Sequence, residues 1–156
     1  MSTRFEIPLC DPDKTAAFAR RLGALLGPGD VILLEGPIGA GKTHFARSLI
    51  QSLLMIPEDV PSPTFTLVQT YETAACEIWH SDLYRLSDPQ EIEELGLIDA
   101  FDTAICLIEW PDRLGSFAPK SALHLGFTSG PGDLDRTIIA TAPTPIWQTR
   151  MKEITK

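Results

Sequence analysis

The sequence predicts an α/β fold in which a central mixed sheet is flanked by helices. Two apolar runs, residues 31–35 and 104–109, are short and bounded by turn signals, as the buried strands of such a sheet are. Segments with apolar residues at helical spacing lie before and after the first run. A glycine-rich segment, residues 36–43, joins that run to the following helical segment. Strand, glycine-rich loop and helix in this order are typical of α/β proteins.

Length and composition indicate one domain spanning residues 1–156, in which the sequence leaves only the structure of the tail, 142–156, undetermined. The three cysteines lie far apart and form no Cys-x-x-Cys pair, which fits a reducing cytoplasm. Residues 1–7 lack the apolar run of a signal peptide, and no stretch approaches the roughly 20 apolar residues that span a bilayer. We therefore expect a cytoplasmic protein without a membrane contact.

A formal net charge of −8 argues against one class of function, tight binding to bare nucleic acid. Proteins of that class use lysines and arginines to displace counterions from phosphates. If RNA matters to the function of this chain, we expect a protein partner to hold it.

The first two helices are predicted from caps and apolar spacing. Asp11 and Pro12, a cap residue and a first-turn proline, begin the first helix. The Gly-Pro-Gly-Asp segment at residues 27–30 should end it, and its apolar face should comprise Phe18, Leu22, Leu25 and Leu26. A second helix is expected from Lys42, with Phe45, Leu49 and Leu53 on its buried face. The prolines within residues 57–63 should end that helix.

Strands dominate the rest of the prediction. Residues 66–71 and 76–80 are predicted to form a hairpin. A short helix is expected from Asp88 to Gly96. Beyond the strand at 104–109, the prediction contains a proline-interrupted loop from residue 112, strands near 123–127 and 136–141, and a turn at 130–132. Residues 147–156 fit either a short amphipathic helix or a loose tail, and the sequence does not decide between them.

The segment Gly36-Pro-Ile-Gly-Ala-Gly-Lys-Thr43 matches the phosphate-binding pattern G-x-x-x-x-G-K-[ST] in full. Its glycines permit successive N–H groups to face an anion at a helix N-terminus. The lysine can then reach the outer phosphates, and the threonine hydroxyl can bind magnesium. A chance match in a glycine-rich turn is the alternative, and the strand and helix around the loop disfavour it. The fold class becomes a P-loop NTPase-like sandwich that binds ATP and Mg²⁺, with candidate nucleotide contacts at Gly36, Gly39, Ala40, Gly41, Lys42, Thr43 and His44.

Two carboxylates are placed to assist the loop in hydrolysis. Glu109 ends an apolar strand and Asp82 follows another, and ligands of open α/β sheets gather at such strand ends. We expect Asp82 and Glu109 to serve a magnesium ion together with Thr43, and Lys42, Asp82 and Glu109 to be catalytic. The alternative for each carboxylate is a structural role at the end of a loop.

Three further features are less decided. The hydroxyl-rich segment at residues 61–66 fits a nucleotide-sensing switch and a capped proline turn about equally. Trp110 fits a base-stacking residue and a core residue equally. For His80 we favour a structural role over the orientation of a water molecule.

Four motifs in order carry a resemblance to a known family: the loop ending in Thr43, Ser-Pro-Thr-Phe-Thr-Leu-Val at 62–68, His-Ser-Asp-Leu-Tyr-Arg-Leu at 80–86, and Leu-Ile-Glu-Trp-Pro at 107–111. Together they closely resemble the TsaE (formerly YjeE) family, bacterial ATPases of tRNA threonylcarbamoyladenosine synthesis, over roughly residues 10–140. The resemblance implies that Trp110 lies near the base, Thr15 near the nucleotide and Arg136 near the phosphates. Two departures are Pro37-Ile38, where the family usually has Asp-Leu, and Ser81, where it usually has an aromatic residue.

The resemblance also implies partners. TsaE proteins work with TsaD and TsaB, which transfer the threonylcarbamoyl group to adenosine 37 of tRNA. This chain is then expected to dock on the TsaD–TsaB pair when ATP is bound and to reset the complex by hydrolysis. It should have weak activity alone and meet tRNA only through the complex.

Other functions remain as alternatives. A small-molecule kinase carries the same loop but also needs an arginine-bearing lid, and arginines beyond Thr43 are sparse. A GTPase would need an Asn-Lys-x-Asp signature, and the chain contains no asparagine. A binding module that senses ATP without meaningful hydrolysis stays open, and the sequence does not identify a general base.

Overall fold

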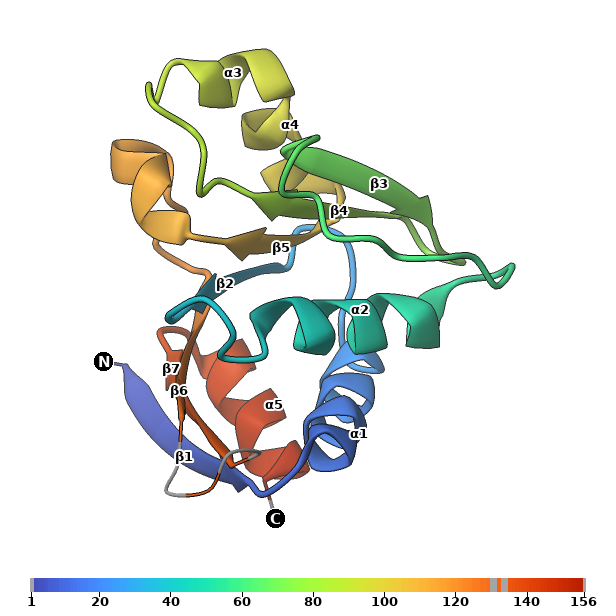
Figure 1. The fold of residues 1–156 in the computed structure, drawn as a ribbon, viewed down its shortest axis with the longest axis vertical. Coiled ribbons are helices and arrows are strands. Elements are labelled where there is room, and N and C mark those ends of the chain that lie inside the picture. Colours follow the sequence, from blue (N-terminus) through green and yellow to red (C-terminus); the bar gives the residue numbers. More distant parts are fainter. Residues whose placement is uncertain (1, 130–131, 133–134, 156) are drawn as a thin grey trace.

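The computed structural model describes residues 2–129, 132 and 135–155 and has a mixed, seven-stranded sheet at its centre (Figure 1). The strand order is β1-β7-β6-β2-β5-β4-β3, with β4, β5, β2 and β6 parallel and the pairs β1–β7, β6–β7 and β3–β4 antiparallel. This confirms the predicted α/β class. The strands are β1 (Thr3–Leu9), β2 (Val31–Glu35), β3 (Val68–Glu72), β4 (Glu77–Asp82), β5 (Ile105–Glu109), β6 (Leu123–Ser129) and β7 (Arg136–Ala142).

Helices cover both faces of the sheet, because the side chains of its central strands alternate between two apolar layers. Ile32 and Leu34 of β2 belong to one layer with residues of α1 (Pro12–Gly23), α2 (Lys42–Leu53) and α5 (Pro145–Ile154). Val31 and Leu33 belong to the other layer, with residues of α3 (Glu91–Leu95), α4 (Leu97–Thr103) and the 3₁₀ segment η1 (Pro111–Phe117). None of the helices in the described residues combines the length and the apolar character that spanning a bilayer requires.

Two predicted helix boundaries are wrong. The helix α1 begins as predicted, with the Asp11 side chain accepting from the Lys14 N–H at 2.9 Å, but ends at Gly23. Leu25 and Leu26 follow it in a turn and still pack against the core. Asp88 accepts from the Gln90 N–H instead of capping a helix, so that α3 begins only at Glu91.

Gly96 ends α3 as predicted, with a φ of +82°, and the unpredicted helix α4 starts directly after it. The strand β1 was not predicted, although Phe5, Ile7 and Leu9 recur at every second position on one face, which is the pattern of a strand. Pro8 is tolerated there because β1 lies at the edge of the sheet. The predicted hairpin is confirmed as β3 and β4.

The open question about residues 147–156 is answered by α5. Pro145 opens this helix, and the Thr144 hydroxyl accepts from the Trp147 N–H at 3.3 Å. Trp147 and Met151 lie in the same apolar layer as α1. A turn is predicted at residues 130–132. Residues 130 and 131 lie outside the described part of the chain.

Candidate nucleotide-binding site

The glycine-rich loop joins the end of β2 to the first residue of α2 (Figure 1). Gly36, Gly39 and Gly41 have φ angles of +150°, +82° and +99°, a region that side chains disfavour. No side chain caps the N-terminus of α2. The N–H groups of its first turn are therefore directed into the loop without a side-chain acceptor, which is what an anion site requires.

Gly36 allows a close approach that no other residue would permit. A Cβ atom there would lie 2.6 Å from the carbonyl oxygen of Phe127 in β6. We expect Gly36→Ala to lower the free energy of unfolding by about 1–3 kcal/mol, the usual cost of such backbone strain. Gly27→Ala is the matched control, because a Cβ at Gly27 meets nothing within 4 Å. Urea unfolding measures both, and equal midpoints for the two variants would contradict this account.

Lys42 is buried, with 5% of its surface exposed. Its ammonium group donates to the Gly36 carbonyl and lies 3.8 Å from the centre of the Trp110 ring. Burial lowers the pKa of Lys42, while the nearby carboxylates Glu109 and Asp82 act in the opposite direction. A buried ammonium held by a carbonyl and a ring gains strongly from an added phosphate.

The two predicted carboxylates lie side by side. Asp82 ends β4, Glu109 ends β5, and the parallel register pairs them directly. Both are buried, and Thr43 Oγ1 donates to Glu109 Oε1 at 2.9 Å. Asp82 accepts from Thr64 Oγ1 at 3.1 Å and from the Tyr84 N–H at 3.0 Å. The structure thus brings the three predicted metal-serving residues together at one edge of the sheet.

These residues share a cavity of about 460 Å³, lined by Ile38, Gly39, Gly41, Lys42, Thr43, His44, Thr64, Asp82, Tyr84, Glu109 and Trp110. Among the described residues, no three His, Cys, Asp or Glu side chains form a metal-binding group. One hydroxyl and two carboxylates fit Mg²⁺ nonetheless, because this ion usually keeps several waters and takes its other ligands from substrate phosphates. Thr64 was predicted only as part of the hydroxyl-rich segment at 61–66, and Tyr84 was not predicted, although its place in the motif at 80–86 gave a signal.

The segment at residues 61–67 forms a tight turn. Leu67 has a φ of +68°, and its N–H donates to the Pro63 carbonyl at 2.7 Å. The Ser81 hydroxyl, which is buried, donates to the Leu67 carbonyl at 2.8 Å. This turn presents Thr64 to Asp82, and the role of the segment as a switch stays a prediction.

The remaining predicted residues lie in two places. Thr15, Arg136 and His44 line a smaller cavity of about 220 Å³ with Pro12 and Gly41. Gly41 and His44 line the larger cavity as well, so the two are adjacent. Ala40 is buried in the core beneath the loop.

Trp110 does not line the smaller cavity. Its ring lies over Lys42, the residue that the motif assigns to the outer phosphates, and 4.8 Å from the ring of Tyr84. The contact of Trp110 with a base stays a prediction.

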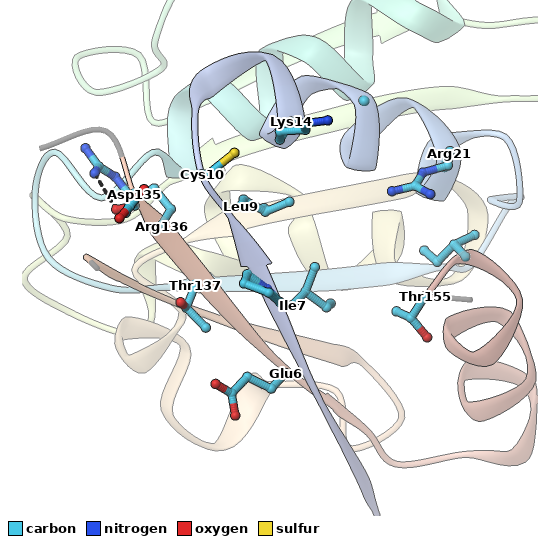
Figure 2. Close-up of a pocket in the computed structure, with 13 residues that line it drawn as sticks. Glu6, Ile7, Leu9, Cys10, Lys14, Arg21, Asp135, Arg136, Thr137 and Thr155 are labelled. Carbon is cyan, nitrogen blue, oxygen red and sulfur yellow. Dashed lines mark hydrogen bonds between the residues drawn. The ribbon is translucent and has the colours of Figure 1, made fainter. Parts of the chain in front are cut away.

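A larger cavity, of about 870 Å³, lies elsewhere (Figure 2). It is formed by β1, α1, the start of β7 and the end of α5, and none of residues 36–43 lines it. Arg136 is shared with the smaller cavity, and its guanidinium group donates to the Gly39 carbonyl at 3.1 Å. The Arg136 side chain therefore lies between the glycine-rich loop and the cavity of about 870 Å³.

A glycine-rich loop between a central strand and a helix, with a hydroxyl and two carboxylates at neighbouring strand ends, defines a P-loop nucleotide-binding protein. The family model described as "Threonylcarbamoyl adenosine biosynthesis protein TsaE" matches residues 9–138. The chain belongs to the TsaE family.

Individual relatives agree with this assignment. The TsaE protein of Rickettsia bellii is 42% identical over 113 residues, which cover 72% of this chain and 78% of that protein. The TsaE protein of Bacillus subtilis is 38% identical over 133 residues, which cover 85% of this chain and 82% of that protein. The match to the Rickettsia felis protein covers 61% of its length. Among solved structures, the crystal structure of Bacillus subtilis YdiB matches with a TM-score of 0.82 and 29% identity, covering 99% of this chain and 96% of that one.

Proposed function

We propose that this protein binds ATP with Mg²⁺ in the cavity at the loop and hydrolyses it in support of threonylcarbamoyladenosine formation at position 37 of tRNA. The observation that carries the proposal is the convergence of Lys42, Thr43, Asp82 and Glu109 in one cavity. Family membership supplies the pathway. The work would take place in the cytoplasm, where tRNA is modified.

Each residue has a defined task in this proposal. The loop amides and Lys42 hold the phosphates, and Thr43, Asp82 and Glu109 hold the ion, in part through water. The ion neutralises charge on the outer phosphates when it is bound. The Thr43 hydroxyl could offer an oxygen lone pair to the ion while it keeps donating its hydrogen to Glu109 Oε1.

Partner dependence is supported by the surroundings of the cavity. Ile38 and Tyr84 line it and are 75% and 44% exposed, and Phe65, next to Thr64, is 83% exposed. Exposed apolar side chains gathered at a site are typical of protein-binding surfaces. We propose that TsaD and TsaB are the partners, that ATP favours docking, and that hydrolysis resets the complex. The net charge of −8 is consistent with tRNA being held by those partners.

The experiment is ATP hydrolysis by the purified protein, alone and with TsaD and TsaB of its own organism. We expect slow turnover alone and a several-fold increase with the partners. Brisk turnover alone, or turnover that requires a small acceptor, would favour the kinase alternative. Slow turnover that the partners leave unchanged would favour an ATP-sensing module.

A further inference from the structure

His80 is a buried polar residue to which the proposed mechanism assigns no task. Its side chain is fully buried in β4, and Nε2 lies 2.7 Å from Glu109 Oε2. We propose that His80 is a positioning residue that holds the Glu109 carboxylate in the orientation needed at the nucleotide site. The proposal rests on the proposed function, because it assigns a supporting role at the same site.

The strand register brings the two residues together. Alternate residues of a strand share a face, so His80 and Asp82 of β4 point to the same side of the sheet. Leu107, the partner of His80 in β5, lies two residues before Glu109 and shares its face. Leu107 and Ile78 belong to the apolar layer beneath α2. His80 thus contacts Glu109 from the side of this apolar layer.

Hydrogen-bonding chemistry decides which ring nitrogen of His80 holds Glu109. An ionised carboxylate only accepts hydrogen bonds, so the His80 Nε2 atom must carry the hydrogen in this contact. Among the described residues, His80 Nδ1 has no hydrogen-bond partner. Nε2 is thus the ring atom that holds Glu109, and Nδ1 makes no competing contact.

The consequence concerns the two oxygens of Glu109. Oε2 is occupied by His80, and Oε1 faces Thr43. Rotation of the Glu109 carboxylate would break the contact between Oε2 and His80, so His80 keeps Oε1 directed toward Thr43. Oε1 would then be the oxygen available to an ion bound at this site, directly or through water. Side chains that orient ligating groups in this way are common behind metal sites.

A residue that only fills the core would serve as well without nitrogen atoms. Leucine at this position would pack in the apolar layer and would remove the unpartnered Nδ1, yet it could not hold Glu109. The two roles therefore differ in what His80→Leu should do. A positioning role predicts a folded protein with a weakened ion site, and a core role predicts an intact ion site.

The first measurement is nitrogen-15 NMR of the histidine rings in the unmodified, nucleotide-free protein. We expect a hydrogen on Nε2 of His80, with ring signals that shift in Glu109→Ala. An Nε2 without a hydrogen, or ring signals that Glu109→Ala leaves in place, would overturn the proposal. This measurement requires neither hydrolysis nor partners.

The second measurement is the affinity for Mn²⁺ in the presence of ADP, read from the electron paramagnetic resonance of the free ion. We expect His80→Leu to weaken it about 10- to 100-fold, the usual effect of losing a supporting residue, and ADP binding without metal to stay unchanged. His80→Gln, whose side-chain amide can place a donor near the Nε2 position, should restore affinity to within a few-fold. Ile78→Val, a buried change on the same strand face, is the control for loss of packing alone.

The outcomes separate the two proposals. Binding of Mn²⁺ and ADP by the unmodified protein, with equal binding by His80→Leu, would overturn the role of His80 alone. Weak binding by both His80→Leu and Ile78→Val would reduce His80 to a core residue. If the unmodified protein does not bind Mn²⁺ with ADP, the proposed function falls, and the role of His80 falls with it.

Discussion

Replacing Glu109 with alanine should lower the rate constant of ATP hydrolysis by about 100- to 1,000-fold, the usual loss when one preorganised electrostatic group is removed. Glu109 is buried at the end of β5, where its two oxygens contact Thr43 and His80. Affinity for ATP should change little, because in the proposed site Glu109 would meet the nucleotide through the ion and water rather than directly.

Steady-state hydrolysis in the presence of TsaD and TsaB, together with equilibrium ATP binding, tests this expectation. Glu72→Ala is the matched control, since Glu72 also ends a strand, β3, but is exposed and does not line the cavity. A Glu109→Ala protein with full activity would remove Glu109 from the catalytic set. A variant that loses ATP binding to the same extent as hydrolysis would place its role in binding instead.

Replacing Lys42 with alanine should act on binding rather than on the chemical step. A hydrogen bond to a charged group contributes roughly 1.5–3 kcal/mol, so ATP affinity should fall about 10- to 100-fold. A large loss of affinity is expected because Lys42 is buried, and burial lowers its pKa by disfavouring the charged ammonium. A bound phosphate would stabilise that charge. Hydrolysis at saturating ATP would fall as well if Lys42 also stabilises charge in the transition state.

Isothermal titration with ATP and with adenosine separates the phosphate contribution from that of the base. We expect Lys42→Ala to weaken ATP binding and to leave adenosine binding unchanged. Lys120→Ala, which removes an exposed lysine outside the cavity, should change neither. Unchanged ATP affinity in Lys42→Ala would contradict the assignment of the loop as the phosphate site.

Much of the candidate site could be predicted from the sequence because its central part is local. The pattern from Gly36 to Thr43 is contiguous, and the strand and helix on either side of it are read from apolar runs. Asp82 and Glu109 were found because strand ends of α/β sheets gather ligands. The contact of Thr64 with Asp82 and the place of Tyr84 in the cavity were not predicted, since a hydroxyl and a ring in a proline-rich or loop segment have no periodic pattern.

There are physical reasons why the strand β1 and the end of the helix α1 were not predicted correctly. The strand β1 contains charged residues and Pro8, features of an edge strand that weaken the usual pattern. The apolar residues of the first helical segment continue beyond the end of α1. Leu25 and Leu26 pack against the core from the turn that follows the helix. In this turn the Asp30 side chain accepts from the Gly27 N–H at 2.7 Å. Apolar spacing predicts which residues are buried more reliably than it predicts where a helix ends.

By itself, the sequence determined the phosphate loop, the α/β class and the resemblance to the TsaE family, because these depend on short, contiguous patterns. Only the tertiary structure decided which side chains meet. Thr43 and Glu109 are 66 positions apart and His80 and Glu109 are 29 apart, and both contacts depend on the register of parallel strands. The placement of Trp110 over Lys42 is of the same kind. Register is set by packing across the whole sheet, so a local pattern contains no record of it.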